Sequence, residues 1–133
     1  MQNLGISIAM LGQGVPFFQA GQEFLRSKSG DRNSFNSGDW FNRVDWTLNE
    51  HNWGSGLPPQ GDNNNNWGVL RPVLADPALK PGASQMQSAY AQFRELLRIR
   101  KSSPLFRLRT AGEVNGLVSF LNNGPDQTPG LIV

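Results

Sequence analysis

Apolar side chains recur with helical spacing near the start of the chain. Leu4, Ile8 and Leu11 lie three or four positions apart, so they fall on one face of a helix. Gly12 comes next, at a position where a glycine commonly ends a helix. We therefore predict that residues 4–11 form the end of a helix.

The clearest helical pattern begins at Ser84. The pair Ser84 and Gln87 has the spacing of a capping box, in which two side chains satisfy free N–H groups of the first turn. Apolar side chains then recur every three or four positions, at Met86, Ala89, Tyr90, Phe93, Leu96 and Leu97. Because proline cannot continue a helix, Pro104 sets the limit of the pattern. We predict a helix from Ser84 to about Ser102.

A short apolar run at residues 15–20 lies between two glycines. Runs that are apolar on both faces and bounded by turn residues are typical of buried strands in a parallel sheet. Pro16 is compatible only with the start of such a strand, because proline has no N–H to donate. A polar loop follows the run, as it does at the active-site edge of many α/β enzymes. We predict a parallel strand at this position.

Residues 27–83 show neither the period of a helix nor that of a strand. Loops longer than about 12–15 residues are uncommon in compact domains and are usually functional or disordered. The four tryptophans of the chain all lie in this region, and disordered segments contain few aromatic residues. We therefore expect an ordered loop that packs on a scaffold.

The remaining pattern predicts short strands at residues 105–109 and 117–121, a turn at 122–125 and the start of a strand at 131–133. A parallel strand needs neighbours on both edges, and the chain offers no second strand of that kind. We therefore predict a fragment of a larger fold.

Composition excludes several classes of function. The net charge is only +2, which disfavours nucleic acid or an acidic surface as the partner. The chain has no cysteine, so disulfides, thiolate metal sites and thiol nucleophiles are excluded. No apolar run approaches the roughly 20 residues of a membrane helix. The first residues, MQNLGISIAML, lack the features of a signal peptide.

The loop and its flanks resemble a known family. Residues 14–46, GVPFFQAGQEFLRSKSGDRNSFNSGDWFNRVDW, are similar to the segment around the eighth barrel strand of pullulanases and limit dextrinases. These are starch-debranching members of the α-amylase superfamily. The resemblance continues through HNWGSGLPP (51–59), NNNNWGVLRPVLADP (63–77) and IRKSSPLFRLRTAGEV (99–114). It implies an α/β fragment: the last strand, long loop and last helix of a (β/α)8 barrel in residues 1–103, then the start of a C-terminal antiparallel β-sandwich domain in residues 104–133.

The resemblance also implies an activity for the whole enzyme. Such enzymes hydrolyse α-1,6-glucosidic branch linkages in pullulan, starch or limit dextrins by a retaining mechanism, which requires two carboxyl groups. In the family these carboxyl groups lie upstream of the matching segment, and none of their motifs occurs here. We therefore expect no catalytic residue in this chain, and no activity from the chain alone.

We expect the chain to contribute substrate binding instead. Asn, Asp and Arg suit the hydroxyl groups of a glucan, and the face of Trp suits a sugar ring. The candidates are Asp62, Asn65, Asn66, Trp67, Arg71, Asn36 and Asp39. By resemblance, Asn65 and Arg71 hold a glucose unit; the alternative is that the Asn run is a solvated loop tip. For Asn36 and Asp39 the alternative, which we favour, is a structural role in Asx-turns.

Other polar and aromatic residues receive structural assignments. Gln22 and Glu23 are expected to support the catalytic carboxylates from a second layer. Trp40, Phe41 and Trp46 are expected in the core of the loop.

The single histidine, His51, is expected on the surface, and no transition-metal site is recognisable. No cofactor is expected; calcium in the parent enzyme is a family expectation only. The basic residues around the end of the long helix are expected to be solvated: Arg94, Arg98, Arg100, Lys101, Arg107 and Arg109.

The expected partners are a branched α-glucan and the missing N-terminal part of the barrel, with no nucleic acid and no membrane span. Two other readings stay open: a stand-alone carbohydrate-binding module and a basic RNA-binding domain. By resemblance a secreted or cell-surface bacterial location is favoured, although plastid relatives exist.

Overall fold

The computed structural model describes residues 1–130, and every regular element among them is helical. The chain begins with α1 (Gln2–Leu11) and the short η1 (Gln22–Phe24). The long loop contains η2 (Ser34–Asn36), α2 (Asp39–Asn42), α3 (Gln60–Asn63), η3 (Asn64–Asn66), α4 (Trp67–Ala75) and η4 (Pro77–Leu79). It is followed by α5 (Ala83–Ser102), η5 (Pro104–Arg107) and α6 (Ala111–Leu117).

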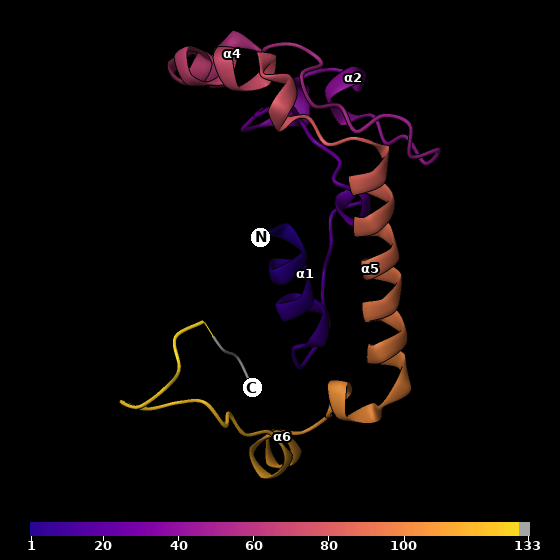
Figure 1. Ribbon diagram of the computed structural model, residues 1–133, viewed down its shortest axis with the longest axis vertical. Helices are drawn as coiled ribbons and strands as arrows, with labels where there is room; N and C mark the ends of the chain where they lie inside the picture. The colour runs from indigo at the N-terminus through magenta and orange to yellow at the C-terminus, as the bar shows by residue number, and fades with distance from the viewer. Residues whose placement is uncertain (131–133) are drawn as a thin grey trace.

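Helix α5 is the axis of the molecule (Figure 1). The loop with α2 and α4 lies at its N-terminal end, α1 lies beside it, and α6 lies beyond its C-terminal end. The main core forms between α1 and α5, which confirms both predicted helices. It consists of buried Ile6, Met10 and Leu96, with Leu11, Phe18 and Phe93 packed against them.

The start of α5 differs from the predicted capping box. The helix begins at Ala83, and the N-cap residue is Gly82. The Gly82 N–H donates a hydrogen bond of 3.0 Å to Oε1 of Gln85. The capping contact is therefore made at residue 82, two residues before Ser84. Because glycine has no side chain, the Gln85 side chain supplies the one side-chain contact of this cap.

The predicted barrel strand is wrong, because no strand occurs in the described range 1–130. Residues 15–19 carry no regular structure, and the side chains of Val15 and Phe17 are exposed. A parallel strand requires hydrogen-bonding neighbours on both edges, and nothing in the described chain supplies them. Phe18 is partly buried, and its ring packs edge-on against Phe93, with the centroids 5.3 Å apart.

The predicted start of a β-sandwich is also wrong. Residues 104–107 form the 3-10 turn η5, in which the Ser103 hydroxyl accepts a hydrogen bond from Leu105 N–H. Thr110 and Glu113 then form a capping box that starts α6, since each side chain accepts a backbone N–H of the other residue.

Beyond α6 the turn lies two residues later than the predicted 122–125: Gln127 N–H donates to the Gly124 carbonyl, so the turn covers residues 124–127. The predicted strand at 131–133 lies outside the described residues.

The C-terminal end of α5 is tied to α1 by Arg100. Its side chain is only 8% exposed, which contradicts the expectation that it is solvated. Nη1 donates to the carbonyls of Met10 (2.7 Å) and Gly12 (2.8 Å), and Nη2 donates to that of Gly14. The guanidinium therefore satisfies the free carbonyls at the end of α1 and places a positive charge there.

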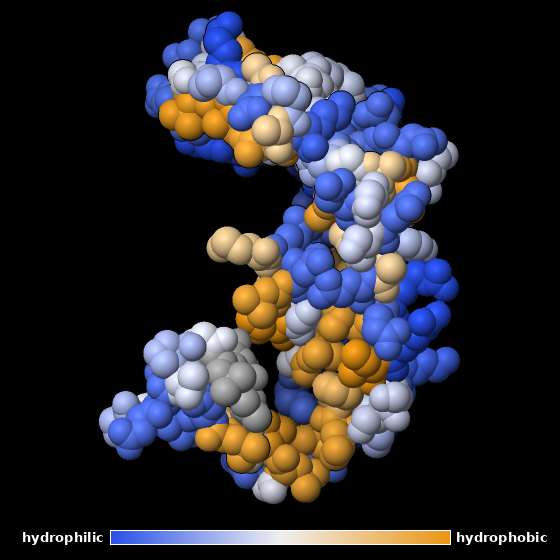
Figure 2. All heavy atoms as spheres, viewed as in Figure 1, coloured by the Kyte–Doolittle hydropathy of each residue, from blue (hydrophilic) through white to orange (hydrophobic). Residues whose placement is uncertain are grey.

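The molecule exposes much more surface than a compact protein of its size. Its accessible surface is 9391 Å² at a mass of 14.7 kDa, whereas a compact monomer of that mass exposes roughly 6,900 Å². Figure 2 shows apolar surface over α1, over α4 and around the C-terminal end of α5. None of the helices in residues 1–130 is long and apolar enough to cross a membrane.

Candidate functional site

The long loop is ordered by side chains that bind backbone carbonyl groups. Arg26 donates from Nε to the Arg43 carbonyl (2.9 Å), from Nη1 to that of Ala20 (3.1 Å) and from Nη2 to that of Asn42. Asn52 donates to the same Arg43 carbonyl (2.7 Å). Partial burial lowers the pKa of the Arg26 guanidinium, which nonetheless stays charged. Three separate stretches of the loop are thereby held together.

A second set of buried bonds joins Ser29 to the stretch around residue 52. The Ser29 hydroxyl donates to the Asn52 carbonyl and accepts from Ser55 N–H (3.2 Å). His51 is buried, not exposed as predicted: Nε2 donates to the Pro81 carbonyl (2.8 Å) and Nδ1 accepts from Trp53 N–H (3.2 Å). The histidine is thus a structural residue that links the loop to the segment before α5.

Asn63 joins the first part of the loop to α3 and α4. It is 1% exposed, and all of its polar atoms are used. Oδ1 accepts from Arg32 N–H (3.0 Å), while Nδ2 donates to Asp31 Oδ1 (3.0 Å) and to the Pro59 carbonyl (2.9 Å).

The carboxyl group that Asn63 contacts carries a shifted pKa. Burial raises the pKa of Asp31, but hydrogen bonds from Ser37, Asn63 and Asn33 and the charge of Lys28 outweigh burial. The net pKa of Asp31 therefore lies below its ordinary value, and its charged form is the one that fits this contact.

Most of the predicted substrate residues lie on one continuous helical segment. Asp62 is on α3, Asn65 and Asn66 are on η3, and Trp67 and Arg71 are on α4. Asp62, Asn65 and Arg71 are exposed, whereas Asn66 and Trp67 are half-buried. Trp67 Nε1 donates to the Pro58 carbonyl (2.8 Å), so its indole anchors α4 and its N–H is not free for a ligand.

The structure brings Asp62 to the first part of the loop as well. Its Oδ2 accepts from Nδ2 of Asn33 (3.1 Å). Arg71 lines a small hollow of about 190 Å³ with Gly54, Gly56, Leu57, Leu74 and Ala75, and no other predicted substrate residue shares it. Asp62 and Arg71 therefore face different neighbours along the same segment.

Asn36 and Asp39 are exposed on η2 and α2. Neither makes the expected Asx-turn; that role falls to Asp31, Asp45 and Asp76, whose carboxylates accept backbone N–H groups two residues later. Of the residues expected in the loop core, Phe41 is buried, but Trp40 and Trp46 are 49% and 66% exposed.

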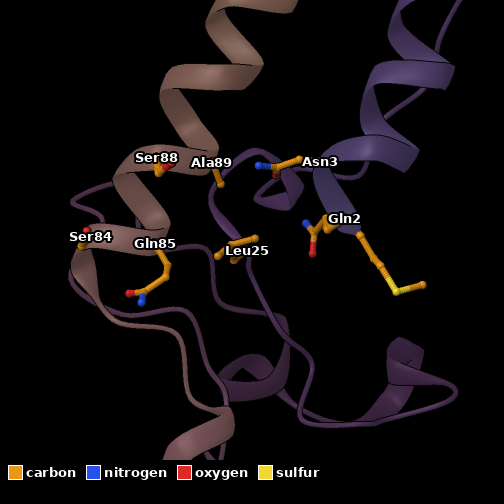
Figure 3. Close-up of a pocket in the computed structure, with 8 residues that line it drawn as sticks. Gln2, Asn3, Leu25, Ser84, Gln85, Ser88 and Ala89 are labelled. Atoms are coloured by element: carbon orange, nitrogen blue, oxygen red, sulfur yellow. The ribbon is translucent and has the colours of Figure 1, made fainter. Parts of the chain in front are cut away.

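Gln22 and Glu23 support their own turn. Glu23 Oε2 accepts from Gly21 N–H (2.8 Å), and the Gln22 carbonyl accepts from Gln2 Nε2 (2.9 Å). Gln2 borders a hollow of about 450 Å³ between the first turns of α1 and α5, where Leu25, Ser84 and Gln85 face it (Figure 3). None of the predicted substrate residues lines this hollow.

Sequence reasoning missed the residues that hold the loop, Arg26, Ser29, Asn52 and Asn63, and also Arg100, which ties α5 to α1. Nothing in the run Asn63–Asn66 marks its first member as the buried one, and the acceptors are backbone carbonyls that every residue has. One missed element did carry a signal, because Thr110 and Glu113 have the capping-box spacing.

The family model described as "Alpha-1,6-glucosidases, pullulanase-type, C-terminal" matches residues 48–133. The chain belongs to this family. Several pullulanases match along the whole chain. The chloroplastic Pullulanase 1 of Arabidopsis thaliana is 53% identical over 133 residues, which are 100% of this chain and 14% of that protein. The pullulanase of Klebsiella aerogenes is 44% identical over 100% of this chain and 12% of its own length.

A pullulanase also shares the structure. A ligand-free mutant of PulA from Klebsiella pneumoniae matches with a TM-score of 0.84 and 41% identity, over 98% of this chain and 12% of that one. This member of the family therefore spans about an eighth of the length of these pullulanases.

No group of three or more His, Cys, Asp or Glu side chains in residues 1–130 is placed to hold a metal ion. The exposed amides, carboxylates and Arg71 are hydrogen-bonding groups of the kind that sugar hydroxyls require.

Proposed function

We propose that this chain is the non-catalytic part of an enzyme that hydrolyses α-1,6-glucosidic branch linkages in pullulan, starch or limit dextrins. Its relatives are pullulanases over the whole of its length. Retaining hydrolysis requires two carboxyl groups, which we assign to the part of the enzyme outside this chain. The role of this chain is to hold the glucan through the segment from α3 to α4.

One observation carries the assignment of that role. Asp62, Asn65 and Arg71 are exposed on a segment whose base is fixed by the buried amide of Asn63 and by the Trp67 indole. A rigid base holds exposed amide, carboxylate and guanidinium groups in place, so little conformational entropy is lost when hydroxyl groups bind them.

The excess surface supports a role inside a larger protein. The chain exposes roughly 2,500 Å² beyond the expectation for a compact monomer, an amount comparable to large obligate interfaces. We assign the occupant of this surface to the remainder of the same enzyme. This observation disfavours the stand-alone carbohydrate-binding module, which would have to fold with that surface in water.

The test uses the Klebsiella pneumoniae pullulanase with its matching segment replaced by this chain. Asn65→Ala and Arg71→Ala should each raise KM for pullulan about tenfold and leave kcat within about twofold, because each removes ground-state hydrogen bonds. Asn64→Ala is the matched control, since Asn64 is exposed on the same turn and is not a predicted ligand.

If all three variants have the same KM as the parent enzyme, the side chains of Asn65 and Arg71 do not bind the glucan. That result would refute the proposed role. A melt of the isolated chain addresses the module directly: a cooperative transition together with maltohexaose binding would favour the module over the enzyme part.

A further inference from the structure

A shallow hollow of about 460 Å³ at α2 is not explained by the roles described so far. It is lined by Asp39, Trp40, Asn42 and Arg43. Trp40 is 49% exposed, although a tryptophan in a loop of this kind would be expected in its core. None of the residues between Asp62 and Arg71 takes part in this hollow.

The Trp40 indole is backed by two neighbours. The ring of Phe41, which is fully buried, lies with its centroid 4.1 Å from that of Trp40, at an interplanar angle of 44°. A Cβ atom at Gly56 would come within 2.7 Å of Trp40 Cη2 and 3.1 Å of Cζ3. Gly56 therefore admits the six-membered ring only because it lacks a side chain, and the indole keeps a fixed position while half of it stays open.

The backbone beneath the hollow is fixed as well. Arg26 and Asn52 both donate to the Arg43 carbonyl, at 2.9 and 2.7 Å. The Asn42 amide donates to the Ser34 carbonyl (2.7 Å), which ties α2 to η2. The hollow is therefore pre-organised, which lowers the entropic cost of binding a ligand.

Two charged side chains at the hollow are free to bind a ligand. Asp39 and Arg43 are exposed and four positions apart, and neither side chain makes a hydrogen bond or an ion pair within residues 1–130. One carboxylate and one guanidinium line the hollow, and the Arg43 charge also acts on Asp45, whose pKa it helps to lower, so the hollow has no excess positive charge and favours a neutral ligand over an anion such as phosphate. A neutral ring with an apolar face for Trp40 and hydroxyl groups for Asp39 and Arg43 is a pyranose.

We propose that this hollow binds a glucose unit of an α-glucan chain, with Trp40 as the platform and Asp39 and Arg43 as the hydroxyl ligands. The choice of a glucan among neutral sugars rests on the proposed function. The enzyme then holds its glucan at two neighbouring places, the α3–α4 segment and this hollow, because Gly56 both contacts Trp40 and lines the hollow beside Arg71.

The experiment uses the same Klebsiella pneumoniae pullulanase carrying this chain, labelled with 5-fluorotryptophan. Trp40→Phe identifies the fluorine resonance of Trp40 by its disappearance, and Trp46→Phe identifies that of Trp46, a more exposed control outside the hollow. Maltohexaose is the ligand, because it is an α-1,4-glucan without the linkage to be hydrolysed. We expect the Trp40 resonance to shift saturably and the Trp46 resonance to stay in place.

Asp39→Ala and Arg43→Ala should each raise the half-saturating maltohexaose concentration at Trp40 about tenfold, since each removes charged hydrogen bonds. Both residues are exposed, so these variants keep the fold. A Trp40 resonance that does not move with maltohexaose would overturn the proposal. So would a Trp40 resonance without a solvent-isotope shift, because another polypeptide segment would then cover the hollow.

Pullulan hydrolysis by the same protein is measured separately. A shift at Trp40 in a protein that does not hydrolyse pullulan would refute the proposed function and leave this site standing.

Discussion

Replacing Arg100 by methionine tests how strongly α1 is tied to α5. Methionine keeps the apolar stem and removes the donors that now bind the carbonyls of Met10, Gly12 and Gly14. The Met10 contact is buried, and its unpaired carbonyl costs about 1–3 kcal/mol. The other two carbonyls are partly buried and can bind water. The charge lost at the helix end is worth roughly a further 0.3–1 kcal/mol. We therefore expect the free energy of local opening to fall by about 3 kcal/mol.

Amide hydrogen exchange measures this local opening, since it reports the free energy of separate segments within a large protein. The reporting group is Gly12 N–H, which is hydrogen-bonded to the Ile8 carbonyl at 3.1 Å. In the Klebsiella pneumoniae pullulanase carrying this chain, Arg100→Met should speed its exchange about a hundredfold. Arg100→Lys should speed exchange by less than Arg100→Met, because the ammonium group keeps the positive charge and can still donate to a carbonyl. It should not restore the parent rate, because it lacks the fixed fork that serves three carbonyls.

Arg98→Met is the matched control, since Arg98 forms only an exposed ion pair with Glu95, at 3.2 Å. Equal exchange in Arg98→Met and Arg100→Met would refute the assigned role of Arg100.

Three further predictions concern the loop. Asn63→Asp puts a second carboxylate where Nδ2 now donates to Asp31, so the two carboxylates repel each other at pH 7. The Arg32 N–H should then exchange about a hundredfold faster than in the parent protein at pH 7, and at nearly the parent rate near pH 4. A difference in exchange rate that does not depend on pH would contradict this. Gly56→Ala should displace Trp40, in addition to straining the backbone at its positive φ, and raise the half-saturating maltohexaose concentration about tenfold; Gly124→Ala, which also has a positive φ but no atom within 4 Å, should have no effect on that concentration. Hydrogen bonds from the Thr47 hydroxyl, Thr47 N–H and Glu50 N–H lower the pKa of Asp45, so order at residues 45–50 should be complete above the unfolded value of about 3.9 and be lost as the pH falls through the folded pKa. The chemical shift of Thr47 N–H follows this loss, and Asp45→Asn should abolish its pH dependence.

The two long helices were predictable because they pack against each other. Met86, Phe93 and Leu96 repeat with the helical period since one face of α5 is covered by α1 and η1, and that cause is visible in the local sequence. The failure at residues 15–20 has the opposite origin. The apolar run predicted a buried strand, but a strand depends on partners elsewhere in space, which the run does not encode, and within the run only Pro16 and Phe18 are even partly buried.

The exposed candidate ligands could be predicted from the sequence, whereas the buried residues that fix their segment could not. Asn65 and Arg71 follow from the chemistry of sugar hydroxyls, so their residue types alone suggested them. Asn63 has the same side chain as Asn65 and the opposite exposure, because it meets Arg32 N–H and the Pro59 carbonyl in the folded loop. Which asparagine becomes structural is decided by tertiary contacts.

The way the loop is held has a consequence for where such an enzyme can work. Its internal bonds run from Arg26, Ser29, Asn52 and Asn63 mainly to backbone groups, and the ion pair Arg98–Glu95, the one found in residues 1–130, lies on α5 outside the loop. Such bonds are short-range and mostly accept on uncharged carbonyl groups, so dissolved ions weaken them less than they weaken ion pairs, and the chain has no thiol to oxidise or reduce. The shape of the loop is therefore independent of redox poise and only weakly dependent on salt, so the same scaffold can serve in oxidising and reducing surroundings alike.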